Sequence, residues 1–119
     1  MSRDPLKTFL VWQKAVQLSI GIYELTRSFP ESERYGLTNQ LRRASVSVAS
    51  NIAEGYGRST RGEYLQFLGH AQGSNCELQT QLIIAASPRM GTENHLRDAE
   101  QLANEVGRML VMLMQRLCK

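Results

Sequence analysis

The feature that most constrains this chain is the spacing of its apolar residues, which recur at steps of three and four along four long stretches. That spacing follows the 3.6-residue period of an α-helix and predicts one buried stripe on each helix. Pro30 ends the first stretch, Gly55 and Gly57 end the second, and Pro88 and Gly91 separate the third from the fourth. The sequence therefore predicts four amphipathic helices of about 20–25 residues each.

The predicted stripes are Val11, Ala15, Leu18, Ile22, Leu25 and Phe29; Leu37, Leu41, Ala44, Val48 and Ile52; Tyr64, Leu68, Ala71, Asn75, Leu78, Leu82 and Ala85; and Leu96, Ala99, Ala103, Val106, Leu110, Leu113 and Leu117. Short connections between such helices favour antiparallel neighbours. A chain of 119 residues with 42% hydrophobic residues can bury a core without disulfides or metal. We expect one domain spanning residues 1–119, with an all-α fold: an antiparallel up-down four-helix bundle.

Capping residues predict where the helices begin. The Asp4–Pro5 pair can open the first helix, with Leu10 as a later alternative. Thr60 and Glu63 have the spacing of a capping box before the third helix, and Thr92 can cap the fourth.

Small and polar side chains on the helices predict close or specific packing. Asn75 lies on an apolar stripe, where a buried asparagine fixes register or meets another polar group. Small residues let a neighbouring helix approach closely, and they recur at Ser45, Ala49, Ala53, Gly69 and Gly73.

Several classes of protein are disfavoured. No apolar run approaches the ~18 residues of a membrane span, and no signal-peptide core follows the N-terminus. Cys76 and Cys118 lack zinc-site or redox spacing, so we expect reduced thiols in or near the core and a cytoplasmic setting.

Catalytic and metal-binding motifs are also missing from the sequence. His70 aligns with Glu63 and Glu77, but successive members lie about 10 Å apart along one helix, too far to share an ion. The chain has no E-x-x-H pair, phosphate-binding loop or nucleophile elbow. We expect neither metal nor cofactor, and a protein that is not an enzyme.

The net charge is +3, and an up-down topology would divide it unevenly between the two ends. One end would collect Arg3, Lys7, Arg58, Arg61, Arg116 and Lys119 against Asp4, Glu54 and Glu63. The other would collect Arg27, Arg34 and Arg89 against Glu24, Glu31, Glu33 and Glu93. A basic end can bind phosphates, although cations near helix C-termini also suit the helix dipole, and both interpretations remain open.

Apolar residues exceed what one four-helix core requires. Trp12, Tyr56, Phe67 and the methionines widen the stripes and suggest oligomerisation. A thick core with ordinary exposed apolar residues is the alternative interpretation.

Particular runs of residues carry a resemblance that spans almost the whole chain. They are Val11-Trp12-Gln13-Lys14-Ala15, Phe29-Pro30, Tyr35-Gly36-Leu37, Gln40-Leu41-Arg42-Arg43-Ala44, Ser50-Asn51-Ile52-Ala53-Glu54-Gly55 with Arg58, and Gly73-Ser74 followed by Glu77-Leu78-Gln79-Thr80-Gln81-Leu82. With them the chain resembles the four-helix bundle proteins encoded by intervening sequences of large-subunit (23S) ribosomal RNA genes. Gln79 and the Ser87-Pro88-Arg89 turn depart from that family's usual pattern.

The resemblance implies a small bundle that assembles into a ring, commonly a pentamer. It also implies a role beside nucleic acid, since the chain is similar to accessory proteins of diversity-generating retroelements, which associate with a reverse transcriptase. In this light Arg43, Ser47, Asn51 and Glu54 share one face of the second helix. We interpret Asn51 and Glu54 as structural hydrogen-bonding residues, with a functional role as the alternative.

Our first hypothesis is a homo-oligomeric ring that binds structured RNA, or DNA, without catalysis. Its predicted phosphate contacts are Lys14, Arg42, Arg43, Arg58 and Arg61. The second is a protein-interaction scaffold or accessory subunit, for instance of a nucleic-acid-processing protein, that never touches nucleic acid. A bundle that binds a metal or small molecule is the third.

Overall fold

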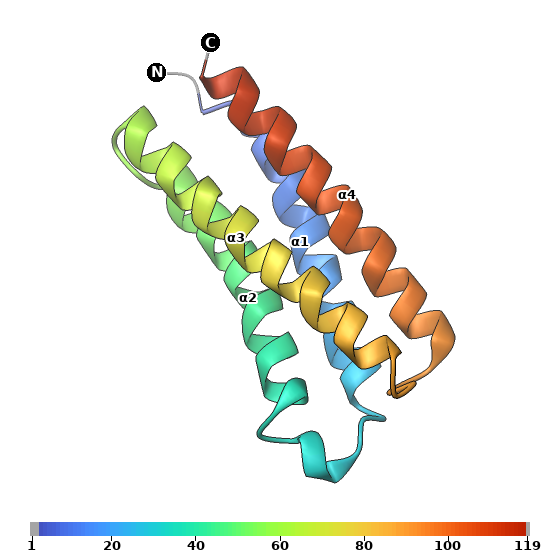
Figure 1. Ribbon diagram of the computed structural model, residues 1–119. Helices are drawn as coiled ribbons and strands as arrows, with labels where there is room; N and C mark the ends of the chain where they lie inside the picture. The colour runs from blue at the N-terminus through green and yellow to red at the C-terminus, as the bar shows by residue number, and fades with distance from the viewer. Residues whose placement is uncertain (1–2, 119) are drawn as a thin grey trace.

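Four long helices carry the predicted stripes and pack around one apolar core in the computed structural model of the chain (Figure 1). The structure describes residues 3–118. Its elements are α1 (Pro5–Thr26), the short 3₁₀ helix η1 (Glu31–Glu33), α2 (Leu37–Tyr56), α3 (Arg61–Ala86) and α4 (Glu93–Leu117). Residues 3–118 contain no strand, and none of their helices is long and apolar enough to cross a membrane.

Consecutive helices run in opposite directions, so the predicted all-α, antiparallel up-down bundle is confirmed (Figure 1). Helix α1 packs against α2 and α4, and α3 packs against the same two helices, which leaves α1 and α3 diagonally opposed. The molecule measures 47 × 23 × 18 Å. Both chain ends and the α2–α3 turn lie at one end of it, and the other two connections lie at the opposite end.

The stripe residues form the core, as predicted. All are buried except Leu37 and Leu96, which are half-buried. Asn75 is fully buried, and its Nδ2 donates to the Ala103 carbonyl of α4 at 2.9 Å. A Cβ at Gly107 would lie 3.1 Å from that Nδ2, so glycine leaves room for the amide. The predicted polar contact of Asn75 is thus confirmed, and it links α3 to α4.

The helix starts agree with the predicted caps in part. The Thr60 hydroxyl accepts from the Glu63 N–H at 3.1 Å, and the Thr92 hydroxyl accepts from the His95 N–H at 3.2 Å. Helix α1 begins at Pro5, so the later start at Leu10 is wrong. The Asp4 side chain forms no cap hydrogen bond.

Three predictions about glycines were wrong. Helix α2 continues through Gly55 to Tyr56, with Gly57 as its C-cap. A Cβ at Gly55 would lie 2.9 Å from the Phe67 Cβ, so this glycine permits the close approach of α2 and α3. Gly69 and Gly73 face open space, because a Cβ at either would meet nothing within 4 Å.

The two cysteines also lie where they were not expected. Cys76 and Cys118 are both exposed. Each directly follows a buried stripe residue, so the helical period turns its side chain away from the core.

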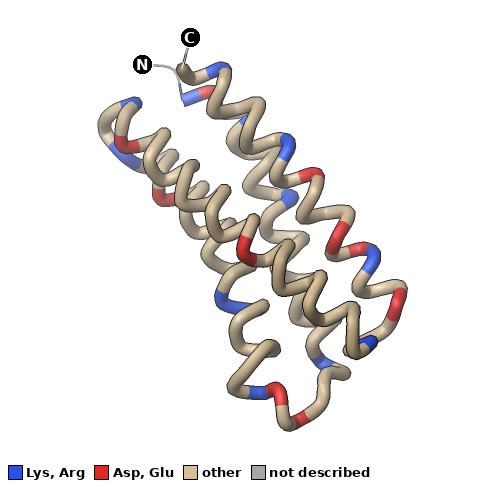
Figure 2. The backbone as a smooth tube through the Cα atoms, viewed as in Figure 1, with Lys and Arg blue, Asp and Glu red and all other residues tan. Residues whose placement is uncertain are grey.

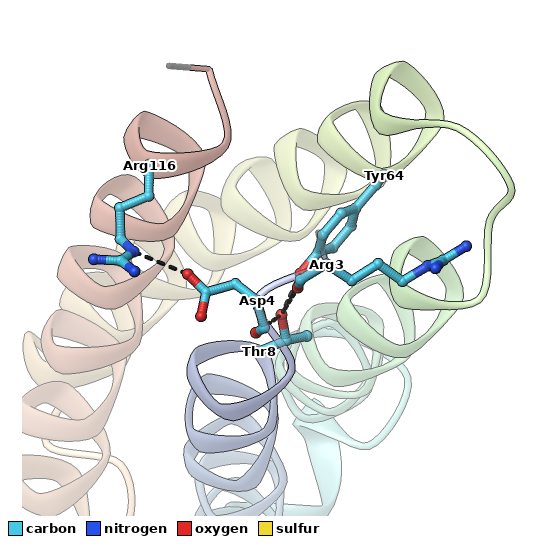
Figure 3. Close-up of polar contacts among 5 residues, drawn as sticks. All are labelled: Arg3, Asp4, Thr8, Tyr64 and Arg116. Atoms are coloured by element: carbon cyan, nitrogen blue, oxygen red, sulfur yellow. Dashed lines mark hydrogen bonds and ion pairs between the residues drawn. The ribbon is translucent and has the colours of Figure 1, made fainter. Parts of the chain in front are cut away.

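A polar network fastens the N-terminal segment to α3 (Figure 3). The Tyr64 hydroxyl donates to the Arg3 carbonyl at 2.9 Å and contacts the Thr8 hydroxyl. The Thr8 hydroxyl also lies 2.9 Å from the carbonyls of Arg3 and Asp4. Burial raises the pKa of Tyr64, while the Thr8 hydrogen bond acts in the opposite direction. The phenol is therefore a protonated donor at neutral pH.

We predict that Gly55→Ala destabilises the bundle by about 1–3 kcal/mol, because the added methyl group would force α2 and α3 apart. Chemical denaturation measures the change. Gly62→Ala is the matched control: a Cβ there meets nothing within 4 Å, and stability should stay equal or rise. Equal effects of the two substitutions would contradict this role for Gly55.

We predict that Tyr64→Phe lowers the free energy of unfolding by about 1 kcal/mol at pH 7, because the Arg3 carbonyl and Thr8 hydroxyl lose a partner. A tyrosine whose folded-state pKa is raised favours folding below its unfolded pKa of about 10, and this contribution falls as the pH rises above that value. Denaturation at pH 7–11 should therefore show a steeper alkaline loss in the parent than in Tyr64→Phe. Parallel pH profiles for the parent and Tyr64→Phe would contradict the prediction.

Candidate nucleic-acid interface

The end of the bundle that holds the chain termini and the α2–α3 turn is rich in basic residues (Figure 2). We call this region the basic end. Its described residues are the cations Arg3, Lys7, Arg58, Arg61 and Arg116, with the acids Asp4, Glu54 and Glu63. Lys119, which was predicted to join them, lies outside the described residues. The sequence predicted that an up-down topology would bring these cations to one end of the bundle. The structure has that topology.

Arg58 is held in place at the α2–α3 turn. Its guanidinium lies over the Phe67 ring, 4.7 Å from the centroid, and its Nη2 is 3.7 Å from a Glu54 carboxylate oxygen. The Arg3 Nη2 donates to the Arg58 carbonyl at 2.9 Å, which joins the N-terminal segment to the turn. The turn is therefore fixed from both sides, with Arg58 partly exposed at its surface.

The other cations of the basic end differ in their pairing. Arg116 donates from Nε to an Asp4 carboxylate oxygen at 2.9 Å (Figure 3). Arg61 and Lys7 are exposed and form no ion pair with any residue that the structure describes. These two side chains are consequently available to an external anion.

Cations at the opposite end are mostly neutralised locally. Arg27 pairs with Glu24 and Arg34 pairs with Glu31, each at 3.4 Å. Arg89 is exposed and forms no ion pair within residues 3–118. The two ends thus differ in charge as the sequence predicted.

The remaining predicted phosphate contacts lie along the sides of the bundle. Lys14 on α1 pairs with Glu105 on α4 at 3.3 Å. Arg42 donates from Nε to the Thr26 hydroxyl at 2.9 Å and lies over the Tyr23 ring. Arg43 is exposed and lines a shallow groove with Arg42. The five predicted residues therefore form three separate groups, with Arg58 and Arg61 at the basic end.

The polar face of α2 connects to α3. Asn51 Nδ2 donates to the Ser47 carbonyl at 2.9 Å and to the Ser47 hydroxyl at 3.0 Å. The Ser47 hydroxyl lies 2.8 Å from the Ser74 hydroxyl of α3. Asn51 thus belongs to a hydrogen-bonded link between two helices, whereas Glu54 is exposed and contributes its ion pair with Arg58.

An apolar groove between α1 and α2 was not predicted as a site. It has a volume of about 390 Å³ and is lined by Pro5, Thr8, Phe9, Trp12, Ile52, Ala53 and Tyr56. Trp12 and Tyr56 are partly exposed there, as expected of surplus apolar residues. Phe9 is exposed as well, and the sequence did not indicate it because it lies off the stripe. Phe67 is half-buried, and Met112 is the exposed methionine of residues 3–118.

The side chains of the described residues form no cluster of potential metal ligands. Within residues 3–118, no group of three or more histidine, cysteine or acidic residues could hold an ion.

Comparisons with known proteins agree with the fold. The chain is similar over 92% of its length to a crystal structure of a protein of unknown function from the S23 ribosomal protein family of Bacteroides thetaiotaomicron, with a TM-score of 0.83, 18% identity and 98% of that chain covered. No curated protein matches the chain. The model of a family described as 23S rRNA-intervening sequence protein matches residues 7–112. Neither match indicates an enzyme family. Since the family model covers most of the sequence, this bundle belongs to the 23S rRNA-intervening sequence protein family.

Proposed function

We propose that the chain is a non-enzymatic, cytoplasmic protein that binds structured RNA through its basic end and works as a homo-oligomeric ring. The observation that carries this proposal is the presence of Arg61 and Lys7, both exposed and without acidic partners in residues 3–118, beside the fixed Arg58. Exposed guanidinium and ammonium groups bind phosphate oxygens, and an arginine can do so with two hydrogen bonds. The family's description also connects it with a ribosomal RNA gene.

A ring would strengthen such binding. If the bundles stand side by side around an axis parallel to their helices, all basic ends gather on one face. Each copy then adds phosphate contacts to the same RNA, so weak single contacts combine into a higher apparent affinity. Arg42 and Arg43, on the side of the bundle, would contact phosphates only where the RNA extends past the end.

A protein-interaction scaffold or accessory subunit is the second candidate. The apolar groove between α1 and α2 favours it, because aromatic side chains in a partly open groove are typical of protein contacts. A nucleic-acid-processing protein would be a fitting partner. Recovery of a partner protein after nuclease treatment, together with undetectable RNA binding at ~50 mM salt, would favour this function over the first.

We predict that Arg61→Glu weakens binding to a folded RNA hairpin and lowers the steepness of its salt dependence by about one phosphate contact. Filter-binding titrations between about 50 and 200 mM salt measure both quantities. Arg61 is exposed and forms no ion pair within residues 3–118, so the fold should be unaffected.

Arg89→Glu is the matched control, since Arg89 is also exposed and forms no ion pair within residues 3–118 but lies in the α3–α4 connection at the opposite end. It changes the net charge by the same amount and should leave affinity nearly unchanged. Equal losses from the two substitutions would mean that total charge, and not the basic end, governs binding. Salt-independent affinity in the parent would contradict phosphate contacts altogether.

A further inference from the structure

A groove on the side of the bundle holds two arginines that no acidic side chain pairs with. Neither Arg42 nor Arg43 forms an ion pair within residues 3–118. We call this the α2 groove, and it is lined by Tyr23, Asn39, Arg42, Arg43, Val46 and Ser47. The groove therefore presents unpaired positive charge outside the basic end.

The Arg42 guanidinium is held in place by helix α1. Its Nε donates to the Thr26 hydroxyl at 2.9 Å, and that hydroxyl donates to the Ile22 carbonyl at 2.7 Å. The guanidinium also lies over the Tyr23 ring, 4.7 Å from the centroid. Its two Nη atoms form no hydrogen bond or ion pair within residues 3–118, so they can donate together to two oxygens of one anion. Because the side chain is already ordered, binding an anion costs little further entropy.

One acidic residue lies near the α3 side of the groove. Ser47, one turn beyond Arg43, lies 2.8 Å from Ser74 on α3, which places Arg43 and Glu77 beside the same α2–α3 seam. Glu77 is exposed, accepts from the Gln81 amide at 3.3 Å and forms no ion pair among the described residues. Its charge would oppose an anion bound in the groove, so its removal reports on what binds there.

Helix α2 carries no unpaired acid between the α2 groove and the basic end (Figure 2). Its charged residues before Glu54 are Arg42 and Arg43, and Glu54 lies 3.7 Å from Arg58. From Arg43 to the last residue of α2, Tyr56, the helix is about 20 Å long at ~1.5 Å per residue. A phosphate backbone can therefore run along this helix without meeting an unpaired carboxylate of α2.

We propose that the α2 groove is a second RNA-phosphate site, and that one RNA lies along α2 from this groove to the basic end. Phosphates repeat along a strand, so a single RNA can occupy both cationic sites at once, whereas a lone carboxylate fills only one. Arg42 binds a phosphate through its two Nη atoms, and Arg43 adds a second cation beside it. The inference rests on the RNA binding of the proposed function and adds the path of the RNA along the bundle.

Two substitutions with opposite expected effects test the groove. The probe is an RNA hairpin with a stem of about 12 base pairs, which is longer than the distance along α2 to the basic end. In filter-binding titrations, Arg43→Glu should weaken binding several-fold and lower the salt dependence by about one phosphate contact. Glu77→Gln should strengthen binding, because it removes the acid beside the groove.

A third substitution tests the geometry at Arg42. Arg42→Lys keeps the charge but loses the planar pair of donors. It should weaken binding several-fold while leaving the salt dependence nearly unchanged, and thermal melting should show that the variant is folded at the assay temperature. Parent-like affinity of a folded Arg42→Lys would contradict the two-donor contact.

Helix α4 supplies matched controls, since Asp98 and Arg108 are exposed there and form no ion pair within residues 3–118. Arg108→Glu and Asp98→Asn make the same changes in net charge as Arg43→Glu and Glu77→Gln, and should leave affinity nearly unchanged. Equal effects within either pair overturn the groove site. Weaker binding by Arg61→Glu without any loss in Arg43→Glu also overturns it, but leaves the basic end as the RNA site. A parent that binds no RNA overturns both proposals.

Discussion

Burial of four apolar stripes against one another is the constraint on which the rest of this structure depends. The stripes lie on long helices with short connections, so neighbouring helices must reverse direction to share one core. That reversal brings Arg3 and Lys7 to the same end as Arg58, Arg61 and Arg116. The charge of the basic end is therefore a consequence of core packing.

The cations of the basic end can lie close together because several of them contact acidic or aromatic side chains nearby. Asp4 accepts from Arg116, Glu54 lies beside Arg58, and the Phe67 ring supports the Arg58 guanidinium. The Tyr64 hydroxyl fixes the backbone at Arg3, whose side chain in turn holds the α2–α3 turn. Arg61 and Lys7 remain exposed on this framework, in positions that an RNA phosphate can reach.

The sequence predicts the core well because the helical period determines which side chains face inward. Every stripe residue from Val11 to Leu117 is at least half-buried. The same period also indicates which way several glycines and a cysteine face, and the sequence prediction did not apply it to them. Gly55 continues the line of Val48 and Ile52 and packs inward, whereas Gly69, Gly73 and Cys76 lie off the α3 stripe and face outward.

Other features of the candidate site could not be predicted from local patterns. The partner of the Tyr64 hydroxyl at Arg3 is 61 residues away in the chain, and no spacing rule connects the two. Lys14 and Arg43 are both basic residues near helix middles, yet one meets Glu105 and the other meets no acid among the described residues. Whether a cation forms an ion pair depends on which residues of the neighbouring helix face it. A single sequence does not specify those facing residues.

The central claim is that the topology builds a phosphate-binding surface at one end of the bundle. Hydrogen exchange measured with and without a folded RNA hairpin tests it most directly, because exposed turn amides exchange quickly unless they are covered. The account predicts RNA-dependent protection at residues 57–61 and near the start of α1, with the η1 connection unchanged. Protection centred on η1 and the α3–α4 connection, or no protection at any position, would contradict it.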